Sequence, residues 1–116
     1  KLLKFNVQLY NDISENVLPQ LLQKLNGSIN FWLDGHYSTG TFKGDKECPI
    51  QEELNIISKN IERFDNIIIF IDDVRCFPIS SSIVSDYPSL DYLVNWARKH
   101  SLCWAIEQDI FIMKNL

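Results

Sequence analysis

The sequence lacks any long apolar segment, and its apolar runs fall well short of the roughly 20 residues that cross a bilayer. Its start also lacks the pattern of a secretory signal peptide. A basic excess is absent too, because 11 Lys and Arg stand against 15 Asp and Glu, for a formal net charge of -4. Nucleic-acid phosphates are bound by basic surfaces, so this balance argues against a nucleic-acid partner.

The chain has few cysteines, and their spacing is irregular. Cys48, Cys76 and Cys103 fit neither a disulfide framework nor a zinc site. We therefore expect free thiols in a reducing compartment such as the cytoplasm. With 116 residues, the chain is expected to form a single domain, 1–116. It begins at Lys1 rather than at a methionine, and we expect it to be a piece of a longer polypeptide.

Apolar periodicity predicts an alternation of strands and helices. Helical faces are expected at Val17 to Leu25, at Ile50 to Ile61 and at Leu90 to Ala97, with Pro19 limiting how early the first helix begins. Asp12 or Ser14 is expected to cap that first helix. Strands are expected at 5–10, 29–33, 67–71, 101–107 and 110–114.

This alternation predicts an α/β fold with a largely parallel sheet. The last two strands are separated by Gln108 and Asp109, and this short connection predicts an antiparallel hairpin at the C-terminal end.

Two of the apolar runs stop abruptly at carboxylates. Asp34 follows Phe31-Trp32-Leu33, and Asp72 and Asp73 follow the run 67–71. If these strands are parallel neighbours, the three acids converge at the carboxyl end of the sheet, where α/β proteins place their chemistry. Converging carboxylates repel unless a cation or protons neutralise them, and Mg²⁺ prefers oxygen ligands. The alternative is that the acids cap the turns and helices that follow the strands.

These motifs resemble those of class I S-adenosylmethionine-dependent methyltransferases, and specifically the C-terminal half of the metal-dependent O-methyltransferases that act on macrolide sugars and related glycans. That family has one aspartate after the fourth strand and an acidic pair after the fifth, which match Asp34 and the pair Asp72 and Asp73. Its seventh strand is antiparallel beside the sixth, a place that 110–114 would take. The resemblance implies a Rossmann-like methyltransferase sheet whose N-terminal strands are missing.

The resemblance also implies cofactors and roles. Mg²⁺ would be held by the three aspartates. S-adenosylmethionine would bind next to Asp12 and Ser14, in the turn that follows the strand at 5–10. His36 is a candidate general base for a sugar hydroxyl, because the ordinary pKa of a histidine side chain lies near neutrality, but it could equally be a metal ligand or a structural loop residue. The family's glycine-rich cofactor loop has no counterpart here, so a preceding N-terminal segment is expected to supply it.

Other interpretations stay open. The chain could be a non-catalytic Rossmann-like module that packs against a partner domain or subunit. A phosphotransfer receiver domain is disfavoured, since there the acidic pair comes first and a lysine follows a later strand. Polar residues in the two long loops could carry substrate specificity or could simply be solvated; these are Tyr37, Ser38, Thr39, Lys43, Lys46 and Arg75. His100, at a helix end, is expected to be structural.

Overall fold

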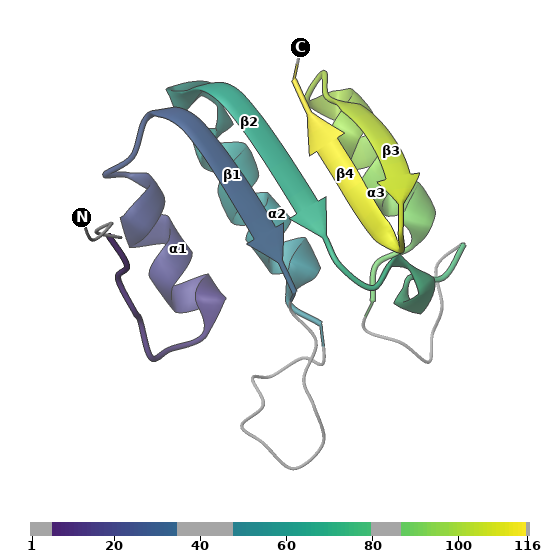
Figure 1. Ribbon diagram of the computed structural model, residues 1–116, viewed down its shortest axis with the longest axis horizontal. Coiled ribbons are helices and arrows are strands. Elements are labelled where there is room, and N and C mark those ends of the chain that lie inside the picture. The colour runs from purple at the N-terminus through teal and green to yellow at the C-terminus, as the bar shows by residue number, and fades with distance from the viewer. Residues whose placement is uncertain (1–5, 35–47, 80–86, 116) are drawn as a thin grey trace, which may run out of the picture.

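A computed structural model of the chain describes residues 6–34, 48–79 and 87–115. Its elements alternate along the chain, as the sequence predicted (Figure 1). In order they are α1 (Ser14–Leu22), β1 (Gly27–Leu33), α2 (Ile50–Asn60), η1 (Ile61–Arg63), β2 (Phe64–Ile71), η2 (Val74–Cys76), α3 (Leu90–Lys99), β3 (Cys103–Glu107) and β4 (Ile110–Lys114).

The four strands form one mixed sheet in the order β1-β2-β4-β3. β1 and β2 are parallel, and β4 is antiparallel to both β2 and β3. The predicted C-terminal hairpin is therefore confirmed. Its turn residues Gln108 and Asp109 have φ of 50° and 65°. Two successive left-handed residues give a two-residue turn whose twist matches the strands, and Asp is one of the few residues that tolerate it.

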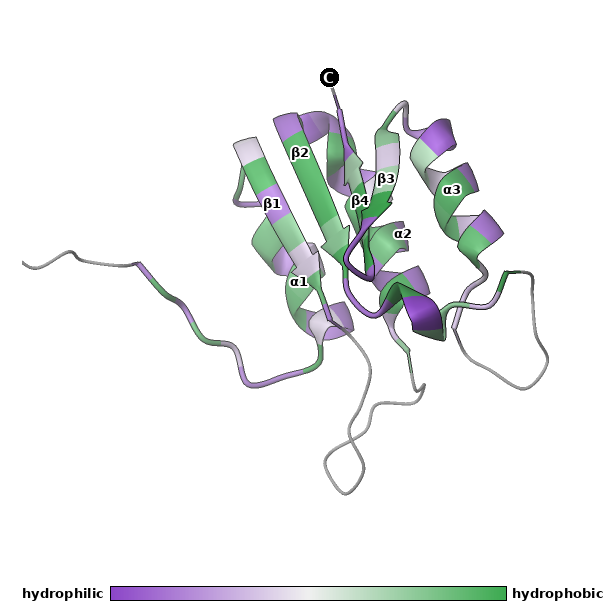
Figure 2. Cartoon of the chain, turned by 45° about the vertical axis from the view of Figure 1, so that its right-hand side comes forward, coloured by the Kyte–Doolittle hydropathy of each residue, from purple (hydrophilic) through white to green (hydrophobic). Residues whose placement is uncertain are grey.

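The helices lie on one face of this sheet, as the two views agree (Figure 1 and Figure 2). On β2 the residues Ile67, Ile69 and Ile71 are buried, whereas Ile68 and Phe70 are only half-buried. This alternation is that of a strand with one covered face and one partly solvated face. The covered face supplies the core together with α2 and α3; its fully buried members include Leu54, Ile57, Leu93, Ala97, Phe111 and Met113.

The opposite face of the sheet is not covered by any described helix. Trp32 lies there with 56% of its surface exposed, and its ring centroid is 5.6 Å from that of Phe70. Of the other two tryptophans, Trp96 is buried and Trp104 is 41% exposed. One face of the sheet is therefore packed against helices, whereas the other exposes part of its apolar surface.

The predicted first strand is wrong. Residues 6–10 have no regular secondary structure, and Val7, Leu9 and Tyr10 are exposed. Their alternating pattern suits a strand, but a strand forms only where a neighbouring strand accepts its backbone hydrogen bonds. No described strand pairs with this segment.

The start of α1 also differs from the prediction. The helix begins at Ser14, so Pro19 lies inside it rather than fixing its start. The N-cap is Ile13, and neither Asp12 nor Ser14 caps the helix through its side chain. A proline within a helix removes one backbone hydrogen bond. The helix is nevertheless attached to the core through the buried side chain of Leu22.

Candidate functional site

The parallel pairing of β1 and β2 determines where their terminal acids lie. Leu33 is in register with Ile71, so Asp34 and Asp72 follow at the same edge of the sheet. The Asp72 amide continues the pairing by donating to the Leu33 carbonyl at 3.1 Å. Two carboxylates that are 38 residues apart in sequence are thereby held side by side.

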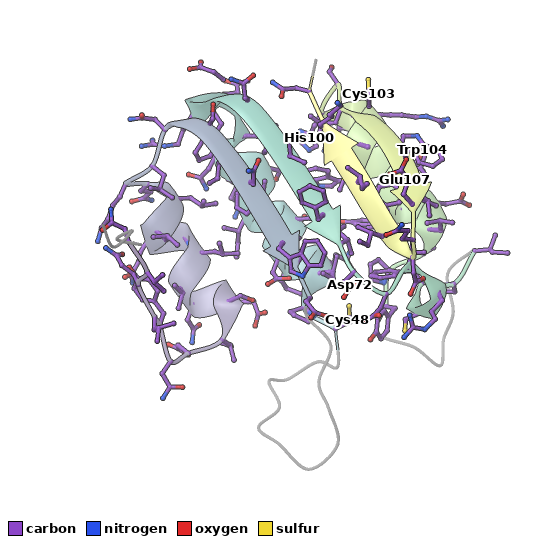
Figure 3. All side chains as sticks on the ribbon, viewed as in Figure 1. Cys48, Asp72, His100, Cys103, Trp104 and Glu107 are labelled. Carbon is purple, nitrogen blue, oxygen red and sulfur yellow. The ribbon has the colours of Figure 1, made fainter. Side chains whose placement is uncertain are left out.

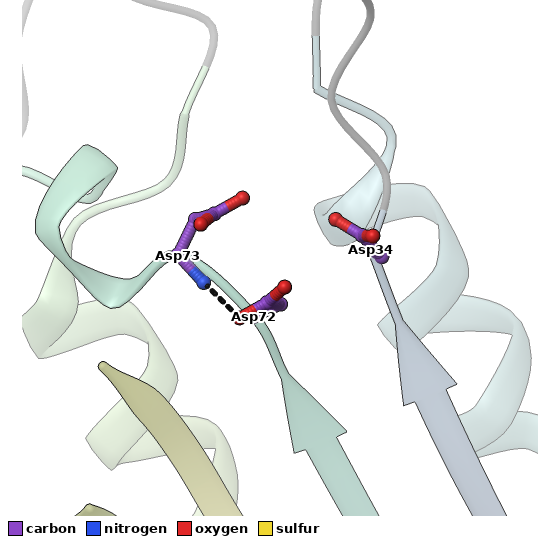
Figure 4. Close-up of side chains that lie close together, drawn as sticks. All are labelled: Asp34, Asp72 and Asp73. Carbon is purple, nitrogen blue, oxygen red and sulfur yellow. Dashed lines mark hydrogen bonds between the residues drawn. The ribbon is translucent and has the colours of Figure 1, made fainter. Parts of the chain in front are cut away.

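Asp34, Asp72 and Asp73 form a cluster in which one carboxylate oxygen from each residue lies within 4.8 Å of the others (Figure 4). Asp34 is exposed, and the other two are half-buried. Asp73 adopts a left-handed backbone with φ 60° and ψ 51°, and its amide donates to Asp72 Oδ1 at 2.9 Å. The predicted convergence of these acids is therefore confirmed.

The donor chemistry of the cluster suits a hard divalent cation. All its ligand atoms are carboxylate oxygens, and its position at the protein surface leaves room for the waters that Mg²⁺ keeps. Opposed ligands around Mg²⁺ are about 4.2 Å apart, given metal–oxygen distances of about 2.1 Å. The oxygens of the cluster lie within 4.8 Å of one another, an upper limit close to that distance. Acidic groups at a surface are also common without any cation.

A guanidinium lies beside the cluster. Arg75 Nη1 is 3.1 Å from Asp73 Oδ1 and also pairs with Asp109 Oδ2. The hydrogen bond to Asp109, followed by the charges of Asp109 and Asp73, raises the pKa of Arg75 above its ordinary value. Arg75 had been grouped with the loop residues that could contact a substrate. The structure instead pairs it with two carboxylates of its own chain.

Asp12 and Ser14 lie together at the start of α1, which no described strand precedes. Asp12 Oδ1 accepts from the Ile13 amide at 2.7 Å and from Asn16 Nδ2 at 3.0 Å. Asp12 also lines an open groove between α1 and the segment that precedes it, together with Leu9 and Tyr10 among others. None of the three clustered aspartates lines this groove.

Several candidate residues lie outside the described part of the chain. His36, the candidate general base, is one of them. The loop residues Tyr37, Ser38, Thr39, Lys43 and Lys46 are the others.

His100 lies at the other end of the sheet from Asp72 (Figure 3). It is the C-cap of α3, and its ring is 4.3 Å from that of Trp96. Burial, and then the charge of Lys99, lower its pKa. The predicted position of His100 at the end of the helix is confirmed, although its lowered pKa disfavours the cationic form that would interact best with the helix dipole.

None of the three cysteines, all of which are described, forms a disulfide; Cys48 is buried and the other two are exposed. Cys48 lies at the same end of the sheet as Asp72, and Cys103 lies near the opposite end (Figure 3). Cys48 and Cys103 therefore lie far apart, at opposite ends of the sheet.

Glu53 is a buried acid that the sequence patterns did not single out. Its side chain is only 5% exposed, and Oε1 has no hydrogen-bond partner among the described residues. Burial raises the pKa of Glu53 from 4.5 to about 7; a hydrogen bond from Ser14 opposes this shift, and the charges of Glu15 and Glu52 add to it. Glu53 is thus partly protonated near neutral pH.

A signal for Glu53 was nevertheless present in the sequence. The buried positions of α2 are Ile50, Glu53, Leu54 and Ile57, which follow the i, i+3, i+4, i+7 spacing of a helix face. Glu53 falls within this apolar stripe. Its place in the first turn of the helix pointed instead to a favourable interaction with the helix dipole.

Among residues 6–34, 48–79 and 87–115, no helix combines the length and apolar character that crossing a bilayer requires. Comparison of the chain with protein families, with curated proteins and with solved structures found no match.

Proposed function

We propose that this chain is the metal- and acceptor-binding portion of an S-adenosylmethionine-dependent O-methyltransferase that acts on a sugar or glycan hydroxyl. The observation that carries the proposal is the cluster of Asp34, Asp72 and Asp73 at the carboxyl ends of two adjacent parallel strands. The strand order adds support, because β4 is antiparallel beside β3 as the resemblance requires of the seventh and sixth strands. A Rossmann-like methyltransferase sheet is part of this proposal.

In this proposal the three aspartates hold Mg²⁺ at the carboxyl ends of β1 and β2. When bound, the metal would lower the pKa of the substrate hydroxyl and orient that group for attack on a methyl carbon. The carboxylates of Asp72 and Asp73 are presented from a turn that the Asp73 amide closes onto Asp72 Oδ1, which limits their freedom. His36 is proposed to accept the hydroxyl proton.

The cofactor is proposed to lie at the start of α1, near Asp12 and Ser14. The groove that Asp12 lines with Leu9 and Tyr10 supports this placement, since it combines an acid with apolar surface. No glycine-rich cofactor loop occurs in this sequence. The remaining contacts to S-adenosylmethionine are therefore proposed to come from a segment that precedes this one.

Metal binding tests the proposal directly. We expect Mg²⁺, titrated calorimetrically, to bind the chain, and Asp72→Asn to weaken that binding at least about 10-fold, because a neutral amide replaces a charged ligand. Asp65→Asn is the matched control, since Asp65 is an exposed residue near the opposite end of the same strand, β2. Absence of binding, or an equal affinity of the two variants, would contradict the metal role.

Cofactor binding is a separate measurement. We expect S-adenosylmethionine to bind weakly to this chain and Asp12→Ala to abolish the residual binding. The proposed site would be wrong if binding occurred and Asp12→Ala left it unchanged.

The second candidate is a non-catalytic module that packs against a partner domain or subunit. The uncovered sheet face favours it, since Trp32 and Phe70 present aromatic surface to solvent there. Trp32→Ser discriminates between the two functions. A packing module would lose its partner with this variant, whereas binding of Mg²⁺ at the strand ends would be retained.

A further inference from the structure

The turn between β3 and β4 contacts the segment that follows β2, next to the acidic cluster (Figure 1). The Val74 amide donates to the Asp109 carbonyl at 2.9 Å. The Arg75 amide donates to Asp109 Oδ1 at 2.9 Å, and Arg75 Nη1 donates to Asp109 Oδ2. Three donors from η2 thus converge on one residue that lies 34 positions further along the chain.

The residues bound by Asp109 directly follow Asp73. The backbone of Asp73 is left-handed, a conformation that costs free energy for most non-glycine residues and needs support from its surroundings. Asp109 supports the backbone conformation of Asp73 because it accepts hydrogen bonds from the amides of Val74 and Arg75, the two residues that follow Asp73. The same guanidinium that bonds Asp109 also reaches Asp73 Oδ1 at 3.1 Å.

We propose that Asp109 is a positioning residue for the acidic cluster, and that Arg75, tethered by Asp109, is a counter-cation that competes with a metal for Asp73. The competition with a metal rests on the proposed function. The contacts of Asp109 with Val74 and Arg75 are present without any metal. Asp109 holds the turn in which Asp72 and Asp73 lie, and so favours cation binding. Arg75 offsets the charge of one ligand, and so opposes it.

The two residues therefore have opposite expected effects on metal affinity. Removing the Asp109 carboxylate loosens the turn that carries two ligands, and outer contacts of this kind commonly change metal affinity about 10-fold or more. Removing the Arg75 charge takes away a competitor. Its side chain is 70% exposed, so solvent screening limits the gain to about two- to fivefold.

Glycine and asparagine variants of Asp109 distinguish the contribution of its carboxylate from that of the turn conformation. Asp109→Gly removes the side chain, and glycine adopts φ near 65° without strain, so the hairpin is retained. Asp109→Asn suits the same turn and keeps an oxygen that can accept from the Arg75 amide. Arg75→Gln removes the guanidinium and leaves that amide in place.

Amide hydrogen exchange tests the anchor without any metal. In Asp109→Gly we expect the Arg75 amide to exchange about 10-fold faster, because it loses a hydrogen bond worth about one factor of ten. The Val74 amide is the internal control, since it bonds the Asp109 carbonyl, which the variant retains. In Asp109→Asn both amides should exchange at the unaltered rate. Unchanged exchange at Arg75 in Asp109→Gly would overturn the anchoring role.

Titration with Mn²⁺ alone, followed by electron paramagnetic resonance, tests the effect on metal binding. We expect Asp109→Gly to bind about 10-fold more weakly, Asp109→Asn to stay within about twofold, and Arg75→Gln to bind two- to fivefold more tightly. Equal affinity of Asp109→Gly and the unaltered chain would overturn the positioning role. Weaker binding by Arg75→Gln would overturn the role of Arg75 as a competitor. If the unaltered chain bound no Mn²⁺, the proposed function would lose its metal, while the exchange data would still decide whether Asp109 anchors the turn.

Discussion

The two faces of the sheet differ in how much of the fold depends on them. On one face Ile69 is fully buried beneath the helices, whereas the adjacent Ile68 is half-buried on the other. Burial of apolar surface is the main source of folding free energy. The covered face therefore carries most of the stability. We expect the face that no described helix covers to tolerate substitutions without unfolding of the chain.

Substitutions on the two faces test this contrast with matched side chains. We expect Ile69→Ala to lower the free energy of unfolding by about 4 kcal/mol, since it leaves a cavity in a packed core. Ile68→Ala removes the same atoms from the next residue of β2 and should cost only about 1 kcal/mol. Chemical denaturation of both variants gives the difference. Equal losses would mean that both faces are packed equally in solution.

Among the described residues, Glu53 is an acid buried on the covered side of the sheet, and it makes stability depend on pH. Burial raises the pKa of Glu53 to about 7 from 4.5. The folded state therefore binds a proton more tightly than the unfolded chain does. The stability that this proton contributes is fully present below pH 4.5 and is lost as pH rises to about 7, a total of about 3 kcal/mol.

Glu53→Gln is expected to remove this dependence, because the amide stays neutral. At pH 8 the variant should be more stable than the unaltered chain by up to about 3 kcal/mol, and at pH 4 the two should be nearly equal. Urea denaturation across this pH range measures the effect. Glu62→Gln, on the exposed side of η1, is the control and should leave the pH profile unchanged. A difference between Glu53→Gln and the unaltered chain that did not vary with pH would contradict the assignment.

The smallest expected effect lies on the uncovered face. Trp32 is already 56% exposed, so Trp32→Ser should cost less than about 1 kcal/mol of unfolding free energy. Thermal unfolding of the two proteins provides the measurement. A large loss of stability would show that this face is covered in solution, and the contrast between the two faces would then fail.

Much of the fold followed from local patterns. The apolar stripes of α2 and α3 and the apolar run of β2 identified these elements, although β2 begins at Phe64, three residues before the predicted start. The hairpin followed from the two-residue connection at Gln108 and Asp109. The prediction for the segment 6–10 was wrong for a different reason. Its pattern is that of a strand, but a strand also needs a neighbouring strand with which to form hydrogen bonds.

The sequence predicted which aspartates form the cluster, but it did not predict the contacts of Arg75 and Asp109 beside them. Strand ends marked Asp34, Asp72 and Asp73, because the carboxyl ends of parallel strands meet at one edge. No local pattern linked Arg75 to Asp109, since the two are brought together only by the placement of the β3–β4 turn. Long-range pairs of this kind depend on strand order, which periodicity does not encode.

The sequence by itself determined three helices, four of the five predicted strands, the positions of the acids along the chain, and the hairpin formed by the last two strands. These features depend on side-chain periodicity and on turn chemistry, which act over a few residues. The tertiary structure decided that β4 lies between β2 and β3, that no described helix covers one face of the sheet, and that Asp109 bonds the segment that follows Asp73. Each of these depends on which distant surfaces bury one another, and that is settled only when the whole core packs.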